Sequence, residues 1–369
     1  MANGKGGWEM RNAKARAGRR LAAVALFMIV ALVAAACGSD DDGGGSGGGG
    51  QAGAPAKIKV QLSWIPDAQF AGYIIARDKG FYKEENLEVE LLPGGPNVNA
   101  VQQVVTGAAD MTINKVSELY AARDKKLPVK AIAQFDQRSS FPLVARKKDG
   151  IDGPADLKGK KVGIWYGGDE YEFFALMQKF GIDPKKDIEL FEQGFTMDPW
   201  LNGDYPVAMT TSFNELNVIR LTGVKDSDLT IINPSDYGIS VPHGALLANE
   251  KWLGSNADAA ARFVRATMKG WDYAFDNQEE AAGITAKAAL AAGGDAATED
   301  LEELQTMSIA EMQRLHYPEG FDKAKHGQID PLIYQHVAEI VKQFGLVKND
   351  PDITGAYDTS VWTAATGGK

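Results

Sequence analysis

A regular alternation of strand-like and helix-like segments, beginning at Lys57, constrains this chain most. Lys57–Trp64 alternates apolar and polar residues, as a half-buried strand does. Ala68–Tyr82 then has apolar side chains at helical spacing, and similar pairs of segments follow with short loops between them. Alternation of this kind predicts an α/β fold built on parallel sheets.

The alternation divides into two units. In the first we expect strands at 57–64, 87–92, 110–113 and 129–135 and helices at 68–82, 97–106 and 115–124. In the second we expect strands at 161–165, 188–192, 207–211 and 229–232 and helices at 170–180 and 214–221. A strand at 245–248 should return to the first unit, and the remainder is helical, at 257–277, 279–291, 299–312 and 331–344.

This order predicts two α/β lobes joined by a hinge. We expect lobe I to comprise residues 57–138 and 243–369, with lobe II, residues 139–242, inserted into it. The chain then crosses twice between the lobes, and two crossovers form a hinge. Because ligands of such sheets bind at the carboxyl ends of strands, we expect a binding cleft between the lobes.

The amino-terminal segment differs in composition from the rest. Arg19 and Arg20 precede an apolar run, Leu21–Ala36, that ends in small residues before Cys37. A basic region, an apolar region and small residues predict a signal peptide over residues 1–36, and the run is short for a membrane-spanning helix. Cys37 stands as in a bacterial lipobox, so we expect it to carry a lipid anchor. An uncleaved anchor helix is the alternative, and the export route, Sec or twin-arginine, stays open.

Residues 37–56 are rich in Gly and Ser and predict a flexible tether. A chain of this length spans roughly 25 Å on average. The folded body is therefore expected outside the cell membrane, held at its surface through the lipid anchor alone.

Charge and cysteine content exclude several classes of function. The net charge is -10, and the chain beyond the basic leader carries -15, which disfavours nucleic acid or an anionic membrane surface as the main partner. A single cysteine excludes an intramolecular disulfide and a cysteine-based metal site. Metalloprotease, hydrolase and phosphate-loop motifs do not occur, so we expect no catalytic residue, no metal and no cofactor. We also expect a monomer.

Several short segments resemble a known family. The first unit reads Trp-Ile-Pro-Asp-Ala-Gln-Phe-Ala-Gly-Tyr at 64–73, followed by Gly80-Phe81-Tyr82, Pro-Gly-Gly-Pro at 93–96 and Gly-Ala-Ala-Asp at 107–110. The second offers Gly-Gly-Asp-Glu-Tyr at 167–171, Gln-Gly-Phe at 193–195 and Ser-Phe-Asn-Glu at 212–215. Over about residues 57–250 the chain resembles the periplasmic-binding-protein family that includes the sulfonate binders and the thiamine-pyrimidine synthases (NMT1/THI5-like), nearest to the ABC-transporter lipoproteins for thiamine pyrimidine precursors and for riboflavin.

The resemblance implies a type II periplasmic-binding-protein fold and one task, which is to capture a small heteroaromatic solute and deliver it to an ABC permease. Phe70 stands where the fungal synthases carry their pyrimidine-donating histidine, and their cysteine-rich iron motif is absent. We therefore expect a binder and no enzyme. The alternatives are a thiamine-pyrimidine-synthase-like enzyme and a nitrate or alkanesulfonate receptor, which would require Arg or Lys in the cleft.

Candidate ligand-binding residues come from the predicted strand ends of both lobes. Aromatic rings there can stack on a planar solute, although Trp64 and Trp165 could equally be core residues. Glu215 can accept from an exocyclic amine, or else complement a helix start, where Asn214 could also be the N-cap. The full set is Trp64, Asp67, Gln69, Phe70, Tyr73, Asn114, Trp165, Tyr166, Glu170, Asn214, Glu215 and Tyr237.

Overall fold

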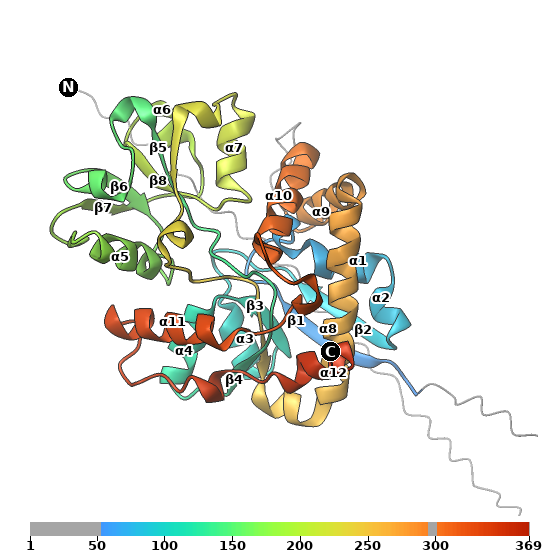
Figure 1. Ribbon diagram of the computed structural model, residues 1–369. Coiled ribbons are helices and arrows are strands. Elements are labelled where there is room, and N and C mark those ends of the chain that lie inside the picture. Colours follow the sequence, from blue (N-terminus) through green and yellow to red (C-terminus); the bar gives the residue numbers. More distant parts are fainter. Residues whose placement is uncertain (1–52, 294–300, 369) are drawn as a thin grey trace, which may run out of the picture. The chain divides into compact units, whose positions relative to one another are not determined.

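The computed structural model describes residues 53–293 and 301–368 (Figure 1). The predicted signal peptide, Cys37 and most of the tether lie outside the described residues. The strands are β1 (Ala56–Gln61), β2 (Leu87–Leu92), β3 (Met111–Asn114), β4 (Val129–Gln134), β5 (Leu143–Arg146), β6 (Lys161–Ile164), β7 (Glu189–Glu192), β8 (Val207–Met209), β9 (Leu229–Ile232) and β10 (Ala245–Asn249). The helices are α1 (Ala71–Asp78), α2 (Phe81–Glu84), α3 (Ala100–Thr106), α4 (Val116–Asp124), α5 (Glu170–Lys179), α6 (Asp198–Asn202), α7 (Glu215–Leu221), α8 (Glu250–Asp276), α9 (Gln278–Ala291), α10 (Leu301–His316), α11 (Pro331–Gln343) and α12 (Ser360–Thr366).

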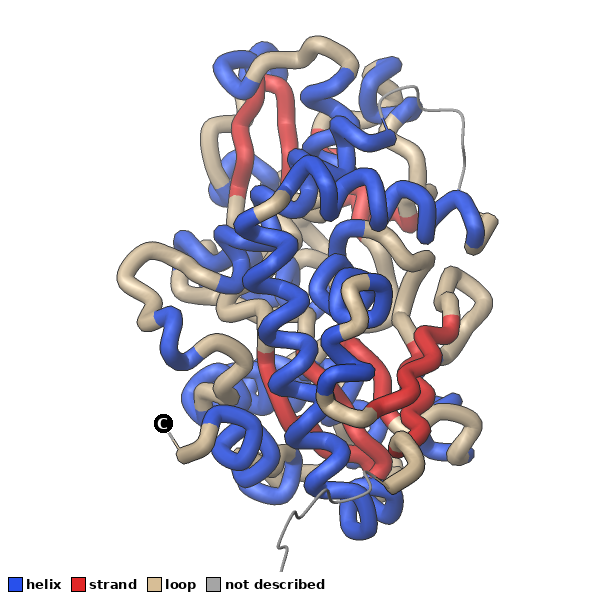
Figure 2. The backbone as a smooth tube through the Cα atoms, turned by 90° about the vertical axis from the view of Figure 1, so that its right-hand side faces the viewer, coloured by secondary structure: helices blue, strands red, loops and turns tan. Residues whose placement is uncertain are grey.

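The strands form two five-stranded sheets, which lie apart in the molecule with helices packed around them (Figure 2). The first sheet has the order β2-β1-β3-β10-β4, and the second has the order β7-β6-β8-β5-β9. Residues 135–142 lead from β4 into β5, and residues 233–244 lead from β9 back to β10. The chain therefore passes twice between the sheets. No helix within the described ranges is both long and apolar enough to cross a membrane.

The prediction of parallel sheets is wrong in part, because both sheets are mixed. β10 runs antiparallel to β3 and β4, and β5 runs antiparallel to β8 and β9. Each of these strands is reached directly from the other sheet. It enters at the edge where the parallel strands end, so it must run in the opposite direction.

Strand β5 was not predicted at all. Its sequence, Leu-Val-Ala-Arg, has no alternation of apolar and polar residues. Leu143, Val144 and Ala145 are all buried, because β5 lies inside its sheet and is covered on both faces. A strand of this kind leaves no period-two signal in the sequence.

The predicted helix over 68–82 is divided in two. A short turn of 3-10 helix, Ala68–Phe70, precedes α1, and the Asp67 carboxylate caps this turn by accepting from the Gln69 N–H at 3.1 Å. Gly80, with φ of 81°, separates α1 from α2. Such a left-handed backbone suits glycine and ends a helix.

Close packing of α1 on α8 sets the geometry of the first lobe (Figure 1). A Cβ atom added at Gly72 would overlap the indole ring of Trp271, and one added at Gly270 would overlap the Gly72 carbonyl oxygen. The absence of side chains at these two positions lets the helix axes approach. Tyr73 and Trp271 are consequently buried together, with ring centroids 6.2 Å apart in an edge-to-face arrangement.

We predict that Gly72→Ala destabilises the protein by about 1–3 kcal/mol, because the new methyl group must displace the Trp271 ring. The matched control is Gly254→Ala, also on a helix, where an added Cβ meets nothing within 4 Å. It should leave stability unchanged or raise it by up to about 1 kcal/mol. Urea unfolding midpoints measure both effects, and equal midpoints for Gly72→Ala and the wild type would contradict the packing described.

Candidate functional site

A cavity lies at the edge of the first sheet where β1, β3 and β4 end and β10 begins. It is narrow, with room for about one water molecule. One of its walls, Phe213, comes from the second sheet's lobe, and the rest come from the first lobe and the crossovers. The lining residues are Ser63, Gln69, Phe70, Tyr73, Ile113, Asn114, Phe135, Asp136, Phe213, His243, Gly244, Trp271 and Met312.

Two buried polar atoms in this lining have no partner. The Tyr73 hydroxyl and the Trp271 Nε1 atom make no hydrogen bond to any described residue, although both side chains are only 1% exposed. Buried polar groups are nearly always hydrogen-bonded, and an unpaired one costs about 1–3 kcal/mol. The residues that line the cavity thus include two hydrogen-bond donors that no described residue accepts from.

The structure brings together four of the predicted site residues. Gln69, Phe70, Tyr73 and Asn114 all line the cavity. Phe70 and Tyr73 are buried, and the Asn114 side-chain oxygen accepts from the Lys115 N–H at 2.8 Å. They meet because the 3-10 turn, α1 and the end of β3 share one edge of the sheet.

The two tryptophans predicted to contact a solute lie beside this cavity and not in its lining. Trp64 packs against Phe195 of the other lobe, with ring centroids 5.2 Å apart. Trp165 donates from Nε1 to the Gly194 carbonyl at 3.1 Å and packs edge-on against Phe141. Both indoles therefore meet the segment Gly194–Phe195 where the lobes touch.

Asp67 and Glu215, predicted from opposite lobes, lie close enough for their charges to interact. Burial raises the pKa of Asp67 to about 7, and the Glu215 charge contributes to the rise. Glu215 itself accepts from the Thr211 N–H at 2.9 Å, the Thr211 hydroxyl at 2.5 Å and the Asn214 amide at 2.9 Å. Its oxygens are thus engaged within its own lobe, and the Asn214 side chain does not cap α7.

Three further predicted residues lie outside the cavity lining. Glu170 accepts from the Gly168 N–H at 2.8 Å at the start of α5, and the Tyr166 side chain is exposed. Tyr237 packs against Phe180, with ring centroids 5.3 Å apart, beyond the far end of α5. A ten-residue helix is about 15 Å long, which separates Tyr237 from Glu170.

Sequence reasoning missed several lining residues. Asp136 lies two residues beyond the end of β4, and Asn114 is the last residue of β3, so the same strand-end argument would have found Asp136. Trp271 and Met312 come from α8 and α10, and only the close packing of α1 on α8 places the tryptophan at the cavity. The signal for that packing is a pair of glycines far apart in sequence. The other missed residues are Ser63, Ile113, Phe135, Phe213, His243 and Gly244.

The crossovers are tied together by one buried carboxyl group. Glu172 of α5 accepts from the Ser139 hydroxyl at 2.5 Å and from the Val241 N–H at 3.1 Å, and Ser139 N–H donates to the Ser240 hydroxyl at 2.9 Å. Burial raises the pKa of Glu172 to about 8. Each crossover thus contacts the same side chain at the point where the lobes join.

Electrostatic contacts also cross this junction. Asp169, at the start of α5, pairs with Lys115 of the first lobe and lies 3.7 Å from His243 Nε2. The His243 ring in turn packs on Phe141 at 4.5 Å. Over residues 53–293 and 301–368, no group of three His, Cys, Asp or Glu side chains has an arrangement that could hold a metal ion.

We predict that stability falls as pH rises through the interval between the ordinary glutamate pKa and about 8, because folded Glu172 retains a proton there that the unfolded chain releases. Each unit of pKa difference corresponds to about 1.4 kcal/mol. Glu172→Gln mimics the protonated form and should flatten this part of the profile. Urea unfolding at about pH 5, 7 and 9 measures it. Parallel profiles for the variant and the wild type would show that Glu172 ionises freely.

Two mixed sheets, two chain crossings and a cavity at facing strand ends define the periplasmic-binding-protein fold. The sulfonate-binding protein SsuA of Methylobacillus flagellatus KT superposes with a TM-score of 0.64, covering 85% of this chain and 94% of its own at 15% identity. The predicted fold class is confirmed. Residues 67–281, more than half of the chain, match the family described as NMT1/THI5 like. The chain belongs to this family, as the sequence resemblance indicated.

Two relatives carry the names of binding proteins. The formylaminopyrimidine-binding protein of Halalkalibacterium halodurans is 27% identical over 62% of this chain and 69% of its own length. The riboflavin-binding protein RibY of Chloroflexus aurantiacus is 27% identical over 82% of this chain and 84% of its own length.

Proposed function

We propose that this protein is the solute-binding component of an ABC import system, which captures a small heteroaromatic vitamin or vitamin precursor and delivers it to a membrane permease. The observation that carries the proposal is the cavity at the strand ends, with two buried donors, Tyr73 and Trp271, that lack a partner within the described chain. The names of the pyrimidine-binding and riboflavin-binding relatives support the solute class.

The lining suits a flat ring with polar edges. Phe70, Phe135 and Phe213 provide aromatic walls, and aromatic pairs contribute about 0.5–1.5 kcal/mol beyond area burial. The Tyr73 hydroxyl and Trp271 Nε1 can donate to ring nitrogens or a carbonyl. The cavity is narrow in this conformation, and a single pyrimidine ring would require less widening than the larger flavin.

An anion receptor fits the lining poorly. No Arg or Lys is among the residues that line the cavity. Asp136 is among them, and its carboxylate would repel nitrate or a sulfonate. Two cations near the lobe junction are paired with carboxylates, Lys115 with Asp169 and Arg138 with Asp236. A synthase reading is also disfavoured, since Phe70 lines the cavity where a pyrimidine-donating histidine would stand. We therefore propose a binder with no catalytic activity.

The remaining parts of the proposal concern the whole chain. A lobe I of residues 57–138 and 243–369 and a lobe II of residues 139–242 would close on the solute about the crossovers tied by Glu172. Differential affinity for the closed form drives such closure. A cleaved signal peptide over residues 1–36, a lipid on Cys37 and the tether would hold a monomer at the outer face of the cell membrane.

Removal of one hydroxyl group tests the site. Tyr73→Phe keeps the ring and removes a donor, so affinity should fall about threefold to tenfold, as expected for one hydrogen bond. The unliganded protein should be as stable as the wild type or more stable, because an unpaired buried hydroxyl is lost. Calorimetric titration with 4-amino-5-hydroxymethyl-2-methylpyrimidine, riboflavin and ethanesulfonate measures affinity.

Tyr82→Phe is the matched control. The Tyr82 hydroxyl lies 2.9 Å from the Thr267 hydroxyl, away from the cavity. This variant should lose about 1 kcal/mol of stability and keep its affinity. Binding of ethanesulfonate alone, or equal effects of the two variants on affinity, would contradict the proposed function.

A further inference from the structure

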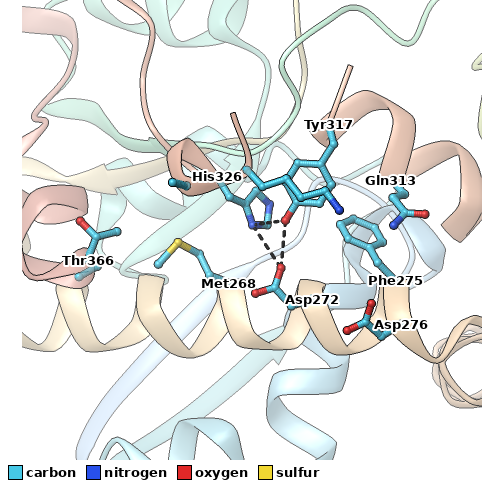
Figure 3. Close-up of a pocket in the computed structure, with 11 residues that line it drawn as sticks. Met268, Asp272, Phe275, Asp276, Gln313, Tyr317, His326 and Thr366 are labelled. Atoms are coloured by element: carbon cyan, nitrogen blue, oxygen red, sulfur yellow. Dashed lines mark hydrogen bonds and ion pairs between the residues drawn. The ribbon is translucent and has the colours of Figure 1, made fainter. Parts of the chain in front are cut away.

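A chain of hydrogen-bonding side chains runs from the cavity to the opposite surface of the first lobe. His316 and His326 are buried, and His316 Nδ1 lies 2.9 Å from His326 Nε2. His326 Nδ1 lies 3.0 Å from the Tyr317 hydroxyl, which donates to Asp272 Oδ1 at 2.9 Å (Figure 3). At the inner end, His316 Nε2 lies 3.2 Å from Oδ1 of Asp136, a lining residue of the cavity.

The hydrogen bond from Tyr317 to Asp272 determines which atom donates in each of the other hydrogen bonds of this chain. The Tyr317 hydroxyl has one proton and gives it to the exposed Asp272 carboxylate, so it must accept from His326 Nδ1–H. Burial, and then the charge of His316, hold the pKa of His326 well below its ordinary value, so this ring is neutral. A neutral ring with a proton on Nδ1 has a bare Nε2, which must accept from His316 Nδ1–H.

These donor and acceptor assignments leave one question, which is whether His316 Nε2, facing Asp136, carries a proton. If His316 were neutral, its bare Nε2 would face the Asp136 carboxylate, and two acceptors would oppose each other at 3.2 Å. A proton on His316 Nε2 would remove this opposition and make the contact an ion pair. The ion-pair distance favours His316 with a proton on Nε2 and Asp136 as the anion.

We propose that Asp136 is the residue that selects the solute, by accepting a ring or amino N–H, and that the proton on His316 is required for it to do so. The inference rests on the proposed function. We expect the solute of this site to be a neutral heteroaromatic ring that carries an N–H donor beside an acceptor. The acceptor would face Tyr73 or Trp271, and the donor would face Asp136.

The contact between Asp136 and His316 leaves Asp136 able to accept a further hydrogen bond from a solute. Asp136 is 2% exposed, and its carboxylate accepts no hydrogen bond of ordinary geometry from any residue within 53–293 or 301–368. His316 Nε2 makes an ion-pair distance but misses the direction of a good hydrogen bond. A carboxylate can accept several donors, so Asp136 retains capacity for the solute. The opposite charges proposed for Asp136 and His316 cancel, so a neutral solute adds no net charge to the buried site.

Other charged and titratable groups face the two ends of this chain. Tyr73 of α1 and His243 of the second crossover interact with Asp136. At the outer end, Asp276 of α8 and Lys323 interact with Asp272, and Lys323 Nζ lies 5.1 Å from the centre of the Tyr317 ring. His316 Nε2 has no hydrogen-bond partner among the described residues, so the Asp136–His316 pair carries the predicted linkage.

The test combines histidine ring NMR with calorimetry on the full chain. In ¹⁵N-histidine-labelled wild type, one ring should be doubly protonated under the conditions in which the solute binds. In Asp136→Asn that signal should be lost, and affinity for 4-amino-5-hydroxymethyl-2-methylpyrimidine should fall about tenfold to a hundredfold. Wild-type affinity should begin to fall at the pH where the ring loses its proton, by about tenfold per pH unit.

Two histidine variants serve as controls. His326→Gln can accept from His316 and donate to Tyr317, so the doubly protonated ring should persist, and His336→Gln, on α11, should change neither the signal nor the affinity. A neutral His316 in the wild type, or wild-type affinity in a folded Asp136→Asn, would overturn the inference while leaving the proposed function intact. Failure of the wild type to bind any heteroaromatic probe at any pH would contradict both.

Discussion

The contact between α1 and α8 is the constraint on which the site depends. Gly72 and Gly270 leave no side chain between the helices, so the Trp271 indole fills that space and Tyr73 lies against it. Both residues are fixed at the edge where the parallel strands of the first sheet end. A larger residue at either glycine would separate the helices and move two of the cavity walls.

Burial of unpaired donors is the energetic consequence of this packing. The Tyr73 hydroxyl and Trp271 Nε1 are buried without a protein partner, and an unpaired buried donor costs about 1–3 kcal/mol. A solute that supplies acceptors would form hydrogen bonds with both donors and so gain affinity. Glu172, which contacts both crossovers, then provides the point about which the lobes would close.

Much of the fold could be predicted from the sequence because its main signals are local. Strand and helix periodicity gave the order of elements, and strand ends pointed to Gln69, Phe70, Tyr73 and Asn114. The same argument, applied to the end of β4, would have given Asp136. It could not give Trp271 or Met312, which reach the cavity from helices through packing, nor β5, whose burial on both faces erases the periodic pattern. Glu215 shows the opposite error. The sequence made it a candidate for solute binding, but its carboxylate oxygens accept from Thr211 and Asn214.

A crystal structure of the protein with a bound 4-aminopyrimidine would test the central claim most directly. The account predicts the ring in the cavity at the strand ends, between the aromatic walls of the two lobes, with the Tyr73 hydroxyl and Trp271 Nε1 within hydrogen-bond distance of its acceptors. A solute bound elsewhere, with both donors still unpaired, would contradict it.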